Sequence, residues 1–158
     1  ADSTHWAAVS RRAVMAFESR YSLRLYLWLS LRANLRKTSE DISLDDLREL
    51  LGIEPGKLKT WQHLKSRALD PALAETNFLA GFHAAYQPLK QGRRVVGVRL
   101  AWSLKDRAEL VAAQKELERP RVGRKARRSG LVETLAEERH RLAESLAHAP
   151  GLDRTTPE

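Results

Sequence analysis

The hydrophobic pattern of this chain changes its period at Gly81. Over residues 58–79, apolar side chains recur with the period of about 3.6 that an α-helix requires. After Gly81 they recur at every second position, over 82–87 and again over 95–102, which is the period of a β-strand. This part of the chain is therefore predicted to form a long helix followed by a β-hairpin. In the second strand Val96, Val98, Leu100 and Trp102 are predicted to share one face.

Shorter elements precede the long helix. Apolar residues at helical spacing predict helices over about 4–17 and about 21–34, and Asp41-Ile42 is predicted to be extended. A further helix is predicted between Ser43, its N-cap, and Gly52, which ends it. The order helix, short strand, helix, helix, hairpin is that of a winged helix-turn-helix.

The predicted fold class is α+β and mostly helical: a winged helix-turn-helix with an extra N-terminal helix and a helical or disordered C-terminal tail. We expect a leading amphipathic helix at 1–18, a winged-helix domain at 19–103, and a basic linker with an amphipathic tail at 104–158. Pro71 lies inside the long helical pattern. Because proline has no amide hydrogen, it is predicted either to kink this helix or to start a second one with Asp70 as the N-cap.

Composition narrows the class of partner. The chain of 158 residues is 42% hydrophobic, which suits one domain with an appendage. No apolar run reaches the ~18 residues of a membrane span, and cysteine is absent, so a cytoplasmic protein that does not enter a membrane is expected. A net charge of +8 favours a polyanionic partner, with nucleic acid first and an acidic membrane surface second.

The positive charge is concentrated between residues 57 and 99, where eight Lys or Arg face two acids. In a winged helix the start of the long helix enters the major groove of DNA, where Arg and Lys donate to guanine and Gln suits adenine. With Trp61, Leu64 and Leu69 toward the core, the residues predicted to contact DNA from this helix are Lys59, Thr60, Gln62, His63, Lys65, Ser66 and Arg67. The alternative is a solvated charged face.

A second basic group lies in the predicted turn Lys90-Gln91-Gly92-Arg93. A wing of this kind reaches phosphates or an adjacent minor groove. The predicted wing residues are Lys90, Gln91, Arg93 and Arg94, and Gly92 is expected to supply a positive φ angle. Basic residues also blunt an exposed hairpin against edge pairing, which is the alternative interpretation.

Enzymatic chemistry finds little support in the sequence. There is no phosphate-binding GxxxxGK[ST] loop, and the five histidines lack the paired spacing of a metal site. The prediction is a protein without cofactor or metal that is not an enzyme. The basic stretch 119–128 suits a DNA-following arm or a solvated linker, and we favour the linker. Leucines at 131, 135, 142 and 146 suggest a final amphipathic helix.

Four segments in order, SRYSLRLYLWL (19–29), ISLDDLRELLGI (42–53), LKSRALDPALAETN (64–77) and YQPLKQGRRVVGVRLAW (86–102), carry a family likeness. Over about residues 17–103 the chain resembles the iteron-binding plasmid replication initiators, or Rep proteins, in their second, C-terminal winged helix. The family's basic cluster falls on Lys65, Ser66 and Arg67, with Ser66 departing from the more basic pattern. Thr76 stands where an apolar residue is common, which is expected to loosen the end of the helix.

The resemblance implies sequence-specific binding of double-stranded DNA at origin repeats (iterons), to initiate plasmid replication in a bacterial cytoplasm. It also implies that monomers bind iterons while homodimers repress the initiator's own promoter, and it suggests a host initiator or helicase as a partner. Two other functions stay open. One is a winged-helix transcriptional repressor that binds an operator. The other is a protein-interaction module that uses the winged helix or the leucines of 131–146.

Overall fold

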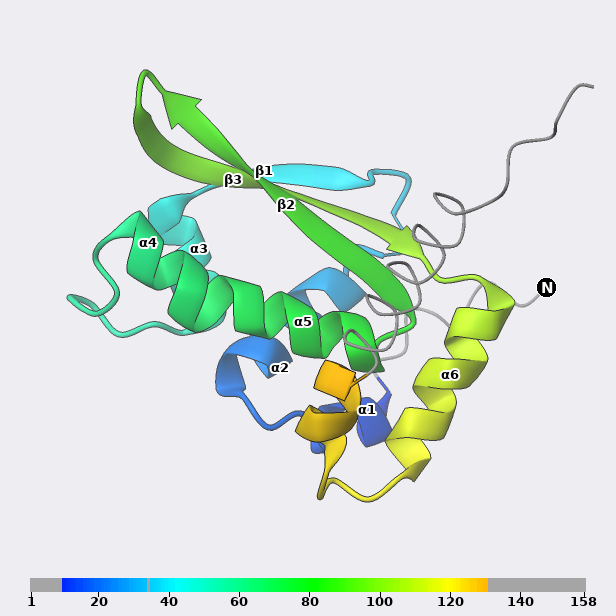
Figure 1. Cartoon of the computed structure of the whole chain (residues 1–158). Helices are drawn as coiled ribbons and strands as arrows, with labels where there is room; N and C mark the ends of the chain where they lie inside the picture. The colour runs from blue at the N-terminus through cyan, green and yellow to red at the C-terminus, as the bar shows by residue number, and fades with distance from the viewer. Residues whose placement is uncertain (1–9, 34, 131–158) are drawn as a thin grey trace, which may run out of the picture. The chain divides into compact units, whose positions relative to one another are not determined.

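The computed structural model describes residues 10–33 and 35–130. Contacts divide the chain into two compact units, residues 1–119 and 120–158. The first unit contains, in order, α1 (Arg11–Ala16), α2 (Arg20–Ser30), β1 (Ser39–Ser43), α3 (Leu44–Leu51), α4 (Trp61–Leu64), η2 (Lys65–Leu69), α5 (Asp70–Leu79), β2 (Phe82–Gln91), β3 (Arg94–Leu104) and α6 (Arg107–Glu118). This order, drawn in Figure 1, confirms the predicted mostly helical α+β winged helix-turn-helix.

Local sequence signals set the ends of several helices. The Ser43 side chain accepts a hydrogen bond from the Asp46 amide, and Gly52 ends α3 with a φ of 71°, as predicted for both. Ser19 caps α2 in the same way by accepting from the Tyr21 amide. The N-terminal helix is shorter than predicted, because Ser10 caps it and it begins at Arg11; residues 1–9 of the prediction lie outside the described residues.

The long helix passes through Pro71 without a break. Residues Lys65–Leu69 form a π-helical turn, in which the Asp70 amide donates to the Lys65 carbonyl, and α5 follows directly. Asp70 has helical backbone angles and makes no capping bond. The predicted alternative in which Asp70 is the N-cap of a second helix is therefore wrong. In a π turn, backbone amides bond carbonyls five residues back instead of four. This change in hydrogen bonding occurs directly before Pro71, which has no amide hydrogen to donate.

β3 is the central strand of a three-stranded antiparallel sheet, with β1 on one side and β2 on the other. β1 is longer than the two residues predicted, since the pairing with β3 extends from Ser39 opposite Ala101 to Ser43 opposite Gly97. A Cβ at Gly97 would collide with the Ile42 carbonyl oxygen of β1, so the close approach of these two strands requires glycine.

Near the hairpin tip, the predicted alternation of β3 is interrupted. The register passes from Leu89 opposite Gly97 to Lys90 opposite Val95, which leaves Val96 as an extra residue in β3. Val96 is 41% exposed, whereas Val98 is fully buried. The prediction that Val96 shares a face with Val98 is therefore wrong, because a β-bulge shifts the phase of the side chains beyond it.

The pairing of β2 with β3 determines which residues of β2 turn their backbone groups toward the outer edge of the sheet. The Lys105 amide donates to the Gly81 carbonyl, so odd-numbered residues of β2 bond to β3 and even-numbered ones turn their backbone groups outward. Ala84 is one of the latter, and its amide and carbonyl both bond the Asn77 side chain at 2.8 Å. Pro88 is another, and a proline is tolerated there because no ladder bond is lost.

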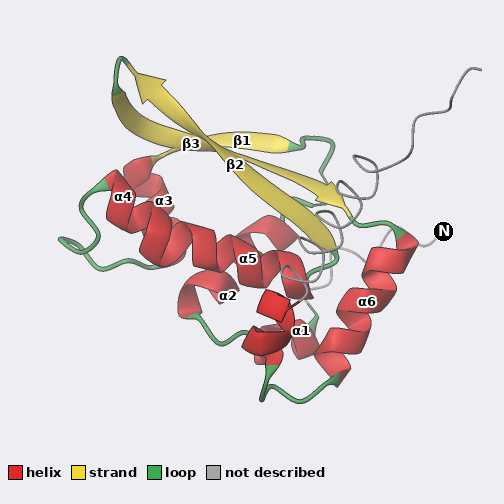
Figure 2. Ribbon diagram, in the orientation of Figure 1, coloured by secondary structure: helices red, strands yellow, loops and turns green. Residues whose placement is uncertain are grey.

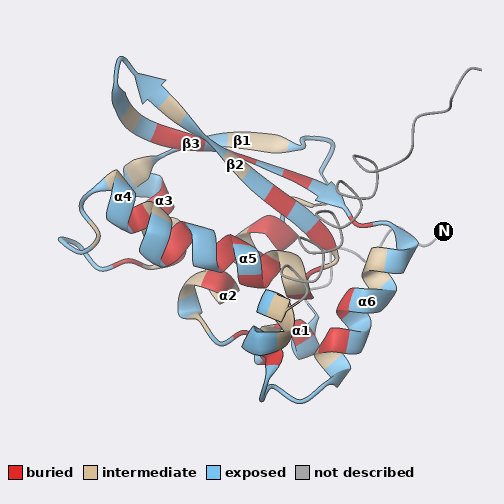
Figure 3. Ribbon diagram, in the orientation of Figure 1, coloured by how far each residue is buried: buried red, intermediate tan, exposed pale blue. Residues whose placement is uncertain are grey.

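The core lies between the sheet and the helices packed on one of its faces, as Figures 2 and 3 show. Each fully buried aliphatic side chain stabilises the fold by about 1.5–3 kcal/mol. The large ones are Leu25, Leu29, Leu47, Leu51, Leu64, Leu69, Leu79, Val98 and Leu100. They come from α2, α3, the long helix and β3, so the helices and the hairpin share one core.

Polar contacts join the end of the long helix to the start of α2. Glu75 is buried and accepts from the Glu18 amide at 2.7 Å and from the Ser22 hydroxyl at 3.2 Å. Thr76 is fully buried and its hydroxyl donates to the Ser22 carbonyl at 3.4 Å. The expectation that Thr76 loosens the helix is therefore not met, because its hydroxyl has a partner in α2.

In the second unit, residues 120–130 are described and residues 124–130 are helical. The Arg127 guanidinium donates to the carbonyls of Pro120 and Val122, so part of the basic stretch 119–128 folds back on itself. The predicted amphipathic helix of residues 131–146 lies outside the described residues.

Candidate nucleic-acid interface

The long helix exposes the face that the sequence pattern predicted. Leu64, Ala68 and Leu69 are fully buried, and Trp61 is half-buried. Of the predicted contact residues, Lys65 is intermediate, and the exposed ones are Lys59, Thr60, Gln62, His63, Ser66 and Arg67. Thr60 has a structural role as well, since its side chain accepts from the His63 amide and caps α4. The Ser66 hydroxyl donates to the Gln62 carbonyl at 2.8 Å.

The turn of the hairpin is tighter than the predicted four residues. Lys90 and Gln91 belong to β2, Arg94 begins β3, and only Gly92 and Arg93 lie between the strands. Gly92 has a φ of 64°, as a two-residue hairpin turn of this kind requires at its first position. All four predicted wing residues are exposed.

Ion pairs separate the basic residues of 57–99 into two groups. Three already have carboxylate partners: Lys57 contacts Glu54 at 2.7 Å, Lys65 is 4.0 Å from Asp70, and Arg99 donates twice to Asp41, at 2.7 and 3.0 Å. The hydrogen bonds from Arg99 and Lys57 hold the pKa values of Asp41 and Glu54 below their ordinary range. In the part of the chain that the structure describes, no carboxylate pairs with the other five, which are Lys59, Arg67, Lys90, Arg93 and Arg94.

Three of the five unpaired cations, Lys59, Arg93 and Arg94, line one groove. A groove of about 620 Å³ lies between the start of α3, the start of α4 and the hairpin tip. Lys59 and Thr60 line it from the helix side, and Arg93 and Arg94 line it from the wing. Figure 1 shows the hairpin tip and α4 at the same end of the unit. Two basic elements that are about 30 residues apart in sequence therefore form one positive surface.

The start of the long helix depends on a residue that the sequence pattern did not single out. Arg48 of α3 donates to the carbonyls of Leu58 and Lys59, at 3.3 and 2.8 Å, and to Asp45 at 3.2 Å. Leu58 has a φ of 48°, a left-handed conformation that costs a non-glycine residue about 1–2 kcal/mol. No sequence signal marks Leu58, because the conformation depends on the surrounding contacts and not on its residue type.

Aromatic residues tie the same helix to β2. The Tyr86 hydroxyl donates to Asp70 at 2.7 Å, and the Tyr86 ring lies edge-on to Trp61 at 6.0 Å between centroids. Burial, together with the neighbouring Asp70 carboxylate, raises the pKa of Tyr86 far above its ordinary value. Tyr86 therefore stays a neutral donor across the physiological range, and the helix and the wing strand are held in one arrangement.

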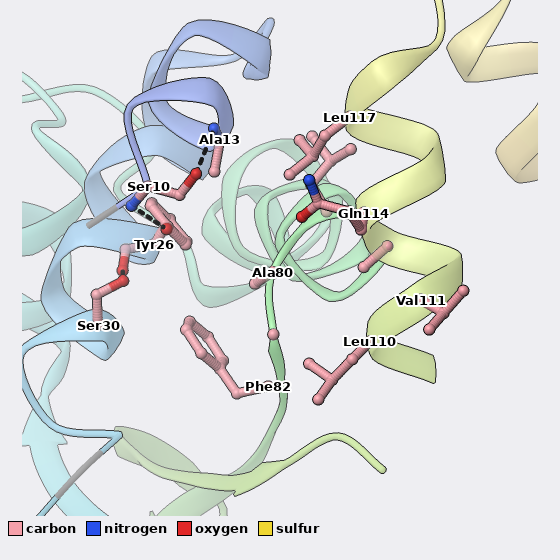
Figure 4. Close-up of a pocket in the computed structure, with 13 residues that line it drawn as sticks. Ser10, Ala13, Tyr26, Ser30, Ala80, Phe82, Leu110, Val111, Gln114 and Leu117 are labelled. Carbon is pink, nitrogen blue, oxygen red and sulfur yellow. Dashed lines mark hydrogen bonds between the residues drawn. The ribbon is translucent and has the colours of Figure 1, made fainter. Parts of the chain in front are cut away.

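A second cavity is mainly apolar, unlike the basic groove. A cavity of about 460 Å³ lies between α1, α2, the start of β2 and α6, and Figure 4 shows Leu110, Gln114 and Leu117 of α6 across it from Ala13 and Tyr26. Its lining is mainly apolar, and it shares no residue with the basic groove.

Among residues 10–33 and 35–130, acidic and histidine side chains form no cluster that would hold a metal ion. No helix in these residues is both long enough and apolar enough to cross a bilayer.

Comparison with known families agrees with this geometry. Residues 43–102 match the family described as initiator Rep protein, WH2. The matched segment begins at the N-cap of α3 and ends in β3, so it contains both halves of the basic groove. Neither the curated proteins nor the solved structures gave a match. Residues 43–102 are therefore similar to the second winged-helix (WH2) domain of initiator Rep proteins.

Proposed function

We propose that this chain binds double-stranded DNA sequence-specifically at the repeated sites (iterons) of a plasmid origin, and that this binding initiates replication. The observation that carries the proposal is the groove between α4 and the wing. Three of its cations, Lys59, Arg93 and Arg94, are exposed, come from two separate elements, and have no carboxylate partner among the described residues. The chain acts by binding and not by catalysis.

The two sides of the groove have different tasks in this proposal. The exposed face of α4 and η2 lies in the major groove, where Arg67 donates to guanine O6 and N7 and Gln62 pairs with adenine. Lys90, Arg93 and Arg94 contact phosphates beside that site, or the adjacent minor groove, and contribute affinity for any sequence. Lys65 contributes less than its charge implies, since Asp70 partly neutralises it.

In this proposal the DNA-binding part of the chain spans residues 19–103, whose elements α2 through β3 share one core, to which Ala13, Ala16 and Phe17 also belong. The same surface suits a transcriptional operator, so autorepression by a homodimer is a second proposed activity of this surface. The two activities require different arrangements of sites. Initiation requires several direct repeats, each bound by a monomer, whereas repression by a dimer requires an inverted repeat.

Selection from a pool of randomised duplexes tests the proposal. The whole chain is expected to enrich one short sequence, and to bind that selected duplex at least 10³-fold more tightly than a scrambled duplex of equal length. Equal affinity for the two duplexes at physiological salt would contradict sequence-specific binding. Absence of binding even at low ionic strength would favour a protein-interaction module.

A further inference from the structure

One arginine beside the proposed interface, Arg48, makes its hydrogen bonds to groups of the protein itself. Arg48 of α3 donates from Nη2 to the Lys59 carbonyl and from Nε to the Leu58 carbonyl, and its Nη1 is 3.2 Å from Asp45 Oδ1. Its side chain is only 20% exposed. Each of the three guanidinium nitrogens therefore has a partner within the domain.

The carbonyls of Leu58 and Lys59 lie in the turn directly before α4. Lys59 directly precedes Thr60, the N-cap of α4, and Leu58 is the residue with the left-handed φ of 48°. A planar guanidinium that binds both carbonyls fixes the direction in which the chain leaves the turn. It thereby fixes where α4 begins and how the Lys59 backbone is oriented relative to the groove.

Arg48 also lines the basic groove, together with Lys59, Arg93 and Arg94. Two roles are conceivable for a cation in that place: it contacts a DNA phosphate, or it orients the residues that contact DNA. The hydrogen bonds favour the second role, because a phosphate contact would have to displace at least one of the carbonyl bonds or the Asp45 carboxylate.

We propose that Arg48 is a positioning residue for base readout. It holds the turn before α4 so that the exposed face of the long helix meets the bases in one fixed orientation, and it makes no contact with DNA itself. This inference rests on the proposed function. It goes beyond it by assigning part of the sequence discrimination to a residue behind the interface.

The variant Arg48→Lys separates the two roles. Lysine keeps the charge, but its compact ammonium cannot bond two carbonyls and a carboxylate in the fixed plane of a guanidinium. Affinity for the duplex selected by the wild-type chain is expected to fall about tenfold, which corresponds to losing one base contact of about 1–3 kcal/mol when the helix is misoriented. Affinity for the scrambled duplex and the slope of log K against log salt are expected to stay unchanged, since the number of phosphate contacts is the same.

Arg24→Lys is the matched control. Arg24 also donates to two backbone carbonyls, those of Leu50 and Glu49, but it does so at the far end of α3, next to Gly52. Its replacement removes the same kind of bond away from the start of α4. The ratio of affinities for selected and scrambled duplexes is therefore expected to remain that of the wild type, at similar loss of thermal stability.

Any result that differs from these expectations contradicts the positioning role of Arg48. If Arg48→Gln weakens binding to both duplexes alike and flattens the salt slope by about one unit, and Arg48→Lys restores both, Arg48 is a phosphate contact. If Arg48→Lys unfolds, or if both lysine variants reduce the ratio equally, Arg48 has a general role in stability. A wild-type chain that does not discriminate between the duplexes would instead refute the proposed function, and the two failures are thus distinguishable.

Discussion

Replacing Arg93 with alanine is expected to weaken binding to every duplex alike, whereas replacing Arg99 is not. Both arginines are exposed and belong to the hairpin. Arg93 is in the turn, and no carboxylate of the described residues pairs with it. Arg99 donates from two nitrogens to Asp41, which faces it across the sheet, so its charge is already compensated. The pair therefore tests whether unpaired charge, rather than positive charge in general, drives DNA binding.

The magnitude follows from counterion release. Each phosphate neutralised by a cation contributes about −0.9 to the slope of log K against log salt. Arg67 is assigned to a base, so four unpaired cations remain; if each neutralises one phosphate, the wild-type slope is about −3.6, and that of Arg93→Ala is about −2.7. Both proteins bind more weakly when salt rises from 50 to 200 mM. The factor by which the affinity of the variant falls is then expected to be roughly 3.5 times smaller than that of the wild type. For Arg99→Ala the slope should stay close to that of the wild type.

Fluorescence anisotropy titrations of one labelled duplex at several salt concentrations measure these slopes directly. A scrambled duplex should give the same slopes, because phosphate contacts carry no sequence information. Equal slopes for Arg93→Ala and the wild type would refute the assignment of Arg93 to a phosphate contact. Flattening by Arg99→Ala as large as that by Arg93→Ala would refute the division into paired and unpaired cations.

Three further predictions concern other parts of the domain. Arg67→Ala should cost about 1–3 kcal/mol on the selected duplex and relax the preference at one base position, which a repeated selection with the variant would detect. The hydrogen bond from Arg32 lowers the pKa of Glu40 below its ordinary value of 4.5, so Glu40 stabilises the fold above that pH and the contribution is lost as pH falls through the lowered pKa. Thermal melts at pH 7 and pH 3 should accordingly show that Glu40→Gln destabilises the protein more at the higher pH. Gly97→Ala should lower the free energy of unfolding by about 1–3 kcal/mol in denaturant melts, since its methyl group would collide with Ile42; an unchanged midpoint would contradict that close approach.

Much of the fold was predictable because its signals are local. A hydroxyl at Ser43 and a glycine at Gly52 mark the two ends of α3, and the change of period at Gly81 separates the long helix from the hairpin. The exposed face of the helix followed from the same period, since the residues that the pattern assigned to the core are buried or half-buried.

The remaining features depend on contacts between distant residues. Leu58 adopts a left-handed conformation beside the Arg48 guanidinium, and neither residue type signals this. The bulge at Val96 arises from the pairing of β2 with β3, which residue alternation within one strand does not reveal. The partial neutralisation of Lys65 depends on Asp70, whose approach follows from the geometry of the π turn. The roles of the predicted DNA-binding residues stay predictions, and the experiments above test those of Arg67 and Arg93.

The outer edge of β2 has a consequence for behaviour at high protein concentration. A strand from another copy can add to this edge only through a run of outward-facing amides and carbonyls. Asn77 occupies both groups of Ala84, and Pro88 offers no amide hydrogen, so Tyr86 is left as the outward-facing residue between two closed positions. The hairpin therefore projects a long wing into solvent while the outer edge of β2 resists intermolecular strand addition in the folded state.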